Sequence, residues 1–184
     1  MLNLSTQDVV LSIEKSPLLV KHGIVYQEYN NFFHVDMIKE LLHLSNLKML
    51  PLENQIEKQR SRVDYQEEIM KRLGIFFRHA SITKALEEKF RTDLKFNSVD
   101  IWQDSPGYFL EPHTDDPRIK LALQIYLGDN SVGTSLYDKD NNILKTFKYK
   151  LNCGYALLNT DISRHGTEGK VTDEVRNSIY VRYR

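Results

Sequence analysis

The spacing of hydrophobic and polar positions changes near residue 95. Before that point, apolar residues recur at the three- and four-residue intervals that are typical of amphipathic helices. Asp36 suits the first turn of one such helix, and Ser81 suits the start of another. A stretch of short apolar runs at 16–29 indicates one or two strands. The predicted helices lie at residues 35–47, 64–80 and 81–90.

After residue 95 the period falls from 3.6 to two, and short strand candidates are separated by Gly, Pro, Asn or Asp. They lie at residues 96–103, 119–127, 133–138, 144–151, 154–160 and 175–184. So many short strands favour an antiparallel sandwich or small barrel covered by the preceding helices. We therefore predict an α+β protein, a single domain over 1–184, in which residues 1–94 are mainly helical and the β-rich core 95–184 carries the site.

Composition adds little beyond this class. The chain has 27% charged and 41% hydrophobic residues, and 25 basic residues balance 25 acidic ones, so nothing indicates a polyanionic partner. No run approaches the roughly 20 apolar residues that span a bilayer, and the amino terminus lacks a basic leader, so we expect a cytoplasmic protein without a membrane partner. The lone Cys153 excludes an intrachain disulfide and a cysteine-built zinc site.

The sequence His113-Thr114-Asp115 contains the first candidate chemistry. In an extended chain, positions i and i+2 point to one side, so His113 and Asp115 could share one face of a metal ion. Equally, the segment could be a turn whose acids cap backbone amides. A third ligand must come from elsewhere in the sheet. His165 follows the strand candidate 154–160, and Gly166 behind it permits a tight turn.

The polar face of the last predicted strand, 175–184, could be exposed to solvent or could line a cavity. Its alternation puts Arg176, Ser178, Tyr180 and Arg182 on one face, which could be the solvated face of an edge strand. If that face lines a cavity instead, Arg176 and Ser178 form a guanidinium and hydroxyl pair suited to a carboxylate. Strand 119–127 poses the same choice, and its Tyr126 would offer a phenol to the same carboxylate.

Taken in order, "EPHTD" at 111–115, Tyr126, His165 and Arg176-x-Ser178 resemble the iron(II)- and 2-oxoglutarate-dependent dioxygenases, in their prolyl-hydroxylase-like branch. The resemblance implies a double-stranded β-helix, or jelly roll, with amino-terminal helices packed on its major sheet. It implies His113, Asp115 and His165 as catalytic iron ligands, and O2 as the second cosubstrate. It also implies that Arg176, with Ser178 and Tyr126, binds 2-oxoglutarate.

Two departures from the family pattern concern the cosubstrate. Many prolyl hydroxylases carry a tyrosine shortly before the iron motif, where this chain offers Gln103 or Tyr108. Several collagen-type members have lysine in place of Arg176, which favours a broader prolyl-hydroxylase-like group.

The implied reaction is hydroxylation of a C–H bond, with release of succinate and CO2. Its substrate would be a prolyl or other residue of a peptide or protein, or a free amino acid. A nucleic-acid dealkylating dioxygenase is an alternative; net neutrality disfavours it, although residues 57–62 with Arg182 and Arg184 could form a local basic patch. A cupin-like protein that binds a metal or a carboxylate without oxidation is another, but it has no need of Arg176. Substrate selectivity is not readable, and 51–62 could be a solvated loop or a lid.

Overall fold

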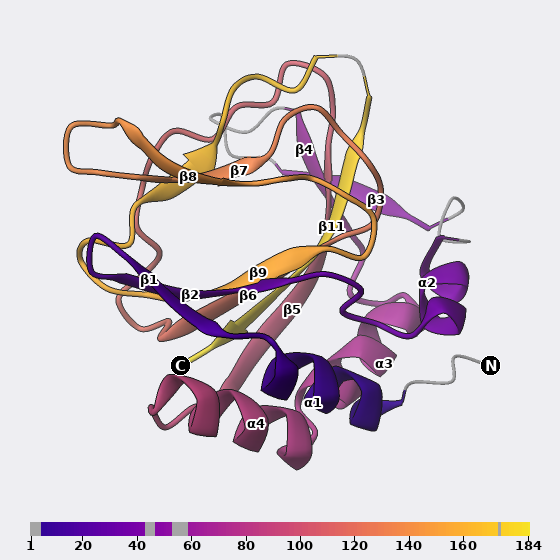
Figure 1. Cartoon of the computed structure of the whole chain (residues 1–184). Coiled ribbons are helices and arrows are strands. Elements are labelled where there is room, and N and C mark those ends of the chain that lie inside the picture. Colours follow the sequence, from indigo (N-terminus) through magenta and orange to yellow (C-terminus); the bar gives the residue numbers. More distant parts are fainter. Residues whose placement is uncertain (1–4, 43–46, 53–58, 173) are drawn as a thin grey trace.

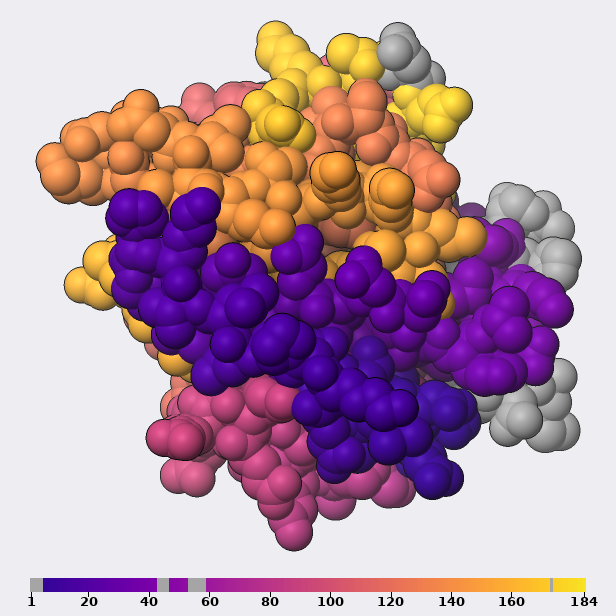
Figure 2. All heavy atoms as spheres, in the orientation of Figure 1, coloured from indigo at the N-terminus to yellow at the C-terminus, as the bar shows by residue number. Residues whose placement is uncertain are grey.

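The computed structural model describes residues 5–42, 47–52, 59–172 and 174–184. In these ranges two antiparallel sheets face each other, and helices lie along the outer face of the larger sheet (Figure 1). The helices are α1 (Thr6–Lys15), α2 (Val35–Leu42), α3 (Glu68–Phe77) and α4 (Ala80–Phe90). In the space-filling view the segment from α1 to β2 runs across the front, below the hairpin of the smaller sheet (Figure 2).

The larger sheet has eight strands in the order β1-β2-β9-β6-β11-β5-β4-β3, and the smaller has three in the order β10-β7-β8. The strands from the first half are β1 (Leu18–Lys21), β2 (Ile24–Tyr29), β3 (Met49–Pro51) and β4 (Arg60–Val63). The others are β5 (Phe96–Asp104), β6 (Leu121–Tyr126), β7 (Thr134–Tyr137), β8 (Ile143–Phe147), β9 (Gly154–Leu158), β10 (His165–Thr167) and β11 (Arg176–Tyr183).

The α+β class and most of the predicted elements are confirmed, with differences in the first half. That half contributes four strands to the larger sheet as well as its helices. Helix α1 was not predicted, and α4 begins at Ala80 rather than at Ser81, after the cap residue His79, whose Nδ1 accepts from the Ser81 amide. Some of the predicted loop 51–62 is strand β4; residues 53–58 lie outside the described ranges, so the lid alternative is untested.

The larger sheet separates two hydrophobic clusters, and its strands alternate between them. On β11, Ile179 and Val181 face the helices and pack into the larger cluster. Arg176 and Ser178 point the other way and are only 2% exposed. Strand β11 lies between β6 and β5, so the alternative of a solvated edge strand is wrong. The inner face of this strand is therefore the wall of an interior space.

No helix among the described residues is both long and apolar enough to cross a membrane.

Candidate metal and carboxylate site

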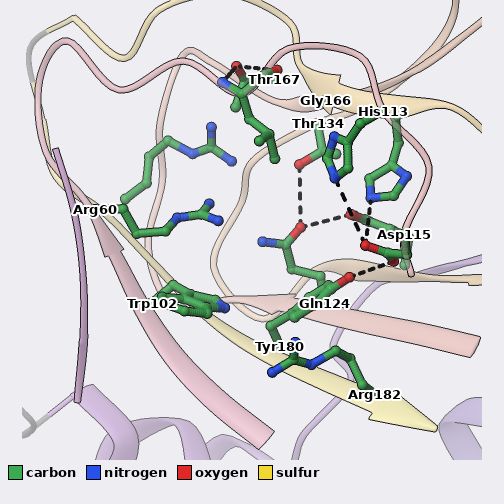
Figure 3. A pocket seen from close by; sticks show the side chains of 14 residues that line it. Arg60, Trp102, His113, Asp115, Gln124, Thr134, Gly166, Thr167, Tyr180 and Arg182 are labelled. Carbon is green, nitrogen blue, oxygen red and sulfur yellow. Dashed lines mark hydrogen bonds and ion pairs between the residues drawn. The ribbon is translucent and has the colours of Figure 1, made fainter. Parts of the chain in front are cut away.

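A polar cavity of about 200 Å³ opens between the two sheets. Its walls come from β4, β5, β6, β9 and β11 of the larger sheet, from β7 and β10 of the smaller one, and from the 105–120 segment. Figure 3 shows the labelled side chains around it, with His113 and Asp115 on one side and Arg60 and Trp102 on the other. The cavity thus has a wall that can bind a metal and, opposite it, a wall of arginine and tryptophan.

His113, Asp115 and His165 meet at the first of these walls. One ligand atom from each lies within 4.8 Å of the other two, and both imidazole Nε2 atoms are 3.9 Å from Asp115 Oδ1. This convergence agrees with the sequence prediction that His113 and Asp115 point to one side and that His165 joins them. Two imidazoles and one carboxylate around an open space match the facial set that holds iron(II) in oxygenases.

The hydrogen bonds behind these three side chains suit a metal at their front. The Nδ1 atoms of His113 and His165 lie 2.9 Å and 3.1 Å from the carbonyl oxygens of Glu111 and Ser163. A carbonyl can only accept, so each Nδ1 carries the proton and each Nε2 presents a lone pair to the shared space. Asp115 Oδ2 accepts from the Tyr180 hydroxyl at 2.8 Å, which leaves Oδ1 facing the imidazoles.

The backbone brings these ligands together without a continuous strand at residues 113–115. His113 and His165 form an isolated bridge, exchanging amide-to-carbonyl hydrogen bonds of 3.0 Å and 2.8 Å. The Asn159 side chain donates to the carbonyls of Asp115, Asp116 and Ile119 and so fixes the segment that follows. Gly166 lies in β10 rather than in a tight turn, and a Cβ there would be 2.5 Å from the Leu110 carbonyl oxygen.

Burial sets the protonation of the groups around the metal wall. Burial lowers the pKa of His165, and His113 lowers it further, while Asp115 acts in the opposite direction. Burial also raises the pKa of Tyr180 well above its ordinary value, and the charge of Asp115 reinforces this. A neutral imidazole and a protonated phenol are the forms needed for metal ligation and for the hydrogen bond to Asp115.

Arg176 lines the cavity, whereas Tyr126, on the same sheet face, is fully buried and lies outside the cavity lining. The Arg176 guanidinium carbon is 4.6 Å from the centre of the Tyr149 ring, which stacks on Tyr126 with 4.2 Å between centroids. Within the described ranges, Arg176 Nε and Nη1 have no hydrogen-bond partner, and the Tyr126 hydroxyl, beside Thr134, also has none. Buried donors without partners are rare and costly. These atoms therefore fit an anionic ligand such as a carboxylate.

Ser178 has a different surrounding from the one predicted. Its hydroxyl oxygen accepts from Gln124 Nε2 at 3.0 Å, and Gln124 lines the cavity in its stead. The Gln124 carbonyl oxygen accepts from the Tyr155 hydroxyl at 2.9 Å. It also accepts from the Thr134 hydroxyl at 3.4 Å (Figure 3). Ser178 thus orients an amide whose second N–H is left for the cavity.

The wall opposite the metal ligands was not predicted as a unit. Arg60, from β4, donates to Asp104 at 2.6 Å and lies over the rings of Trp102 and Tyr108. Arg182 donates to Asp100 at 2.6 Å. The sequence of β5 could have predicted this wall, because Asp100, Trp102 and Asp104 alternate along the strand and so lie on one face.

The two residues suggested in place of the family's tyrosine lie differently. Gln103 points to the other face of the sheet, where it donates to Asn177 Oδ1 at 3.2 Å and lines a separate apolar cavity, so that suggestion is wrong. Tyr108 is fully buried, with its ring 4.2 Å from the Arg60 guanidinium carbon.

Comparison with known proteins identifies the fold. No protein-family model matches the chain, and neither does any curated protein. A crystal structure of a 2OG-Fe(II) oxygenase-family oxidoreductase from Burkholderia pseudomallei matches with a TM-score of 0.65 and 15% identity, covering 97% of this chain and 89% of that one. A prolyl-4-hydroxylase from Pseudomonas putida gives a TM-score of 0.63 at 14% identity, covering 98% of each chain.

A third match is HygX from Streptomyces hygroscopicus, crystallised with nickel, 2-oxoglutarate and hygromycin B. Its TM-score is 0.63 at 12% identity, with 86% of this chain and 82% of that one covered. The chain therefore has the fold of iron(II)- and 2-oxoglutarate-dependent oxygenases, as the sequence resemblance predicted. At these identities the likeness concerns the fold, and any functional assignment depends on the chain's own residues.

Proposed function

We propose that this protein is an iron(II)- and 2-oxoglutarate-dependent oxygenase. The observation that carries the proposal is that one cavity contains two groups able to bind a ligand. The first is a set of three candidate metal-ligand atoms within 4.8 Å of one another, and the second is a buried guanidinium with two nitrogens that have no hydrogen-bond partner among the described residues. The first suits iron(II) and the second suits the distal carboxylate of 2-oxoglutarate. The two facing sheets, on this proposal, form a double-stranded β-helix within a single domain, with the helices on its major sheet.

Each side chain has a separate role in this proposal. His113, Asp115 and His165 would hold iron(II), and two neutral imidazoles with one carboxylate would leave the bound ion a net positive charge. Arg176 would bind the distal carboxylate of 2-oxoglutarate in a fixed orientation, assisted by the Tyr126 hydroxyl, while Ser178 would act by orienting Gln124. When bound, iron(II) and 2-oxoglutarate would activate O2, which is the oxidant: one oxygen atom would enter succinate as 2-oxoglutarate loses CO2, and the other would enter the substrate C–H bond.

For the substrate we propose a prolyl or other residue of a peptide or protein, or a small molecule such as a free amino acid. The two buried Arg176 nitrogens that have no hydrogen-bond partner among the described residues support an oxygenase over a cupin-like binding protein, which has no need of that group. The predicted basic patch does not favour a nucleic acid, because Arg60 and Arg182 are paired with the buried acids Asp104 and Asp100.

The test is turnover of 2-oxoglutarate to succinate by the purified protein with iron(II) under air, first without and then with candidate substrates. His165→Ala removes one imidazole and is expected to abolish metal binding and succinate formation. Arg176→Ala should mainly raise the 2-oxoglutarate concentration needed for half-maximal turnover, because the metal ligands remain. His34→Ala changes an exposed histidine and should behave as wild type. Unchanged turnover in His165→Ala would sink the ligand assignment.

A further inference from the structure

The two oxygens of Asp115 have different surroundings. Oδ1 faces both imidazole Nε2 atoms at 3.9 Å, whereas Oδ2 accepts the Tyr180 hydroxyl at 2.8 Å. The Asp115 side chain is 15% exposed, so the bond to Tyr180 is largely shielded from competing water. One oxygen is thus occupied by protein, and the other remains for a ligand.

Tyr180 is well placed to fix this asymmetry. It lies in the middle of β11, paired with Asp100 on β5 and with Gln124 on β6, so its backbone is held from both sides. Asp115, by contrast, lies 65 residues away in a segment without regular strand structure. The hydrogen bond from Tyr180 therefore ties the Asp115 carboxylate to the rigid sheet and fixes its orientation relative to that sheet.

No other described side chain makes a hydrogen bond to the Asp115 carboxylate. Arg182, two residues further along β11, donates to Ser98 Oγ at 2.9 Å and to Asp100 Oδ2 at 2.6 Å. Tyr155, the other tyrosine in the cavity wall, donates to Gln124. The orientation of the Asp115 carboxylate thus depends on one phenol.

We infer that Tyr180 is a positioning residue that limits Asp115 to one-oxygen coordination of the metal. The inference rests on the proposed iron(II) site. An octahedral ion held by His113, His165 and one oxygen of Asp115 keeps three positions open, and a carboxylate that turned to bind through both oxygens would fill one of them. By engaging Oδ2, the Tyr180 hydroxyl keeps that position available to 2-oxoglutarate or O2.

The test uses cobalt(II) as a spectroscopic probe under anaerobic conditions. Tyr180→Phe removes only the hydroxyl, and Tyr155→Phe is the matched control because it removes a hydroxyl from the same cavity that is bonded to Gln124. We expect Tyr180→Phe to weaken cobalt(II) binding by calorimetry about 10–100-fold. We also expect it to change the cobalt ligand-field spectrum and to weaken 2-oxoglutarate binding to the cobalt form, whereas Tyr155→Phe leaves the cobalt affinity and spectrum unchanged.

The same measurements test the metal site and the role of Tyr180 separately. If wild type and His165→Ala bind cobalt(II) equally, the metal site is wrong and the role of Tyr180 is wrong with it. If His165→Ala loses cobalt(II) binding but Tyr180→Phe keeps the wild-type affinity and spectrum, the metal site stands and the positioning role is overturned. Equal changes in the Tyr180 and Tyr155 variants would also overturn it, because they would reflect a general loosening of the cavity. Should Tyr180→Phe not fold, Tyr180→Leu is expected to show the same spectral change.

Discussion

Arg176 and Tyr126 are unusual among buried residues because Arg176 Nε and Nη1 and the Tyr126 hydroxyl lack hydrogen-bond partners in the described ranges. Leaving a buried donor unsatisfied costs about 1–3 kcal/mol, and more for a charged group. A chain that retains such groups gives up stability in the absence of a ligand, which is common where a binding site must be organised in advance. Their contribution to folding and their contribution to binding should therefore have opposite signs.

Tyr126→Phe separates these two contributions. The variant should be as stable as wild type or more stable by up to about 1 kcal/mol, because it removes an unpaired buried hydroxyl. Its affinity for 2-oxoglutarate should fall about tenfold, since a hydrogen bond to a charged group is lost. Denaturant unfolding and calorimetric titration of the cobalt form would measure the two quantities.

Tyr183→Phe is the matched control for this experiment. Tyr183 is also fully buried, but its hydroxyl donates to the Phe77 carbonyl at 2.8 Å on the helical side of the sheet. Removing that hydroxyl should cost about 1 kcal/mol of unfolding free energy and leave 2-oxoglutarate affinity unchanged. A loss of stability in Tyr126→Phe as large as in Tyr183→Phe would contradict the assignment of an unpaired hydroxyl.

At the scale of elements, the metal wall depends on how closely β10 approaches the 110–113 segment. Besides the bridge between His113 and His165, Thr167 donates its amide to the Leu110 carbonyl at 3.0 Å. Gly166 lies between these contacts, and only a residue without Cβ fits there. The separation of the two imidazoles is therefore set by a backbone contact rather than by the ligands alone.

Gly166→Ala should disturb both stability and metal binding. Its Cβ would lie 2.5 Å from the Leu110 oxygen, so the two segments must separate, at a cost of about 1–3 kcal/mol as for other overpacked sites. We expect weaker cobalt(II) binding together with a lower denaturant midpoint. Gly169→Ala, where nothing lies within 4 Å of the added Cβ, should change neither by much. Wild-type cobalt affinity in Gly166→Ala would show that the contact does not set the ligand spacing.

Some helices and strands could be predicted from the sequence pattern, and others could not. Strand β11 was predictable because its alternation is regular over eight residues, and α3 and α4 because their apolar stripes are long. Strand β10 has three residues, too few for any period to show, so His165 could be expected near the sheet but not within it. Strands β3 and β4 are similarly short and border a polar run, and therefore the contribution of Arg60 to the cavity was missed.

Over the whole molecule, the candidate site is assembled from both halves of the chain. The order of His113, Asp115, His165 and Arg176 could be read from the sequence because each lies in a local pattern. The bond between Tyr180 and Asp115, and the pairing of Arg60 with Asp104, join residues 65 and 44 positions apart. Such contacts depend on strand order, which alternation alone does not determine. This is the physical reason that the first contacts of the site were predictable and their supports were not.

Because the ligands come from separate segments, binding should stabilise the entire fold. A ligand that binds only the folded state at about 100 times its Kd adds about 2.7 kcal/mol. For a chain of this size, that corresponds to a rise in Tm of roughly 5–10 °C. Nickel(II) should therefore raise the Tm of the chelator-treated protein, and 2-oxoglutarate should raise it again only when the metal is present.

Arg176→Ala distinguishes the two increments. The nickel(II) increment should persist, because His113, Asp115 and His165 are intact, while the 2-oxoglutarate increment should be lost with the guanidinium that receives the distal carboxylate. Arg72→Ala, a change on the surface of α3, should keep both. Differential scanning calorimetry with metal and cosubstrate added in turn would measure them. A 2-oxoglutarate increment of full size in Arg176→Ala would mean that the distal carboxylate binds elsewhere, and a nickel(II) increment in His165→Ala would place the metal outside this cavity.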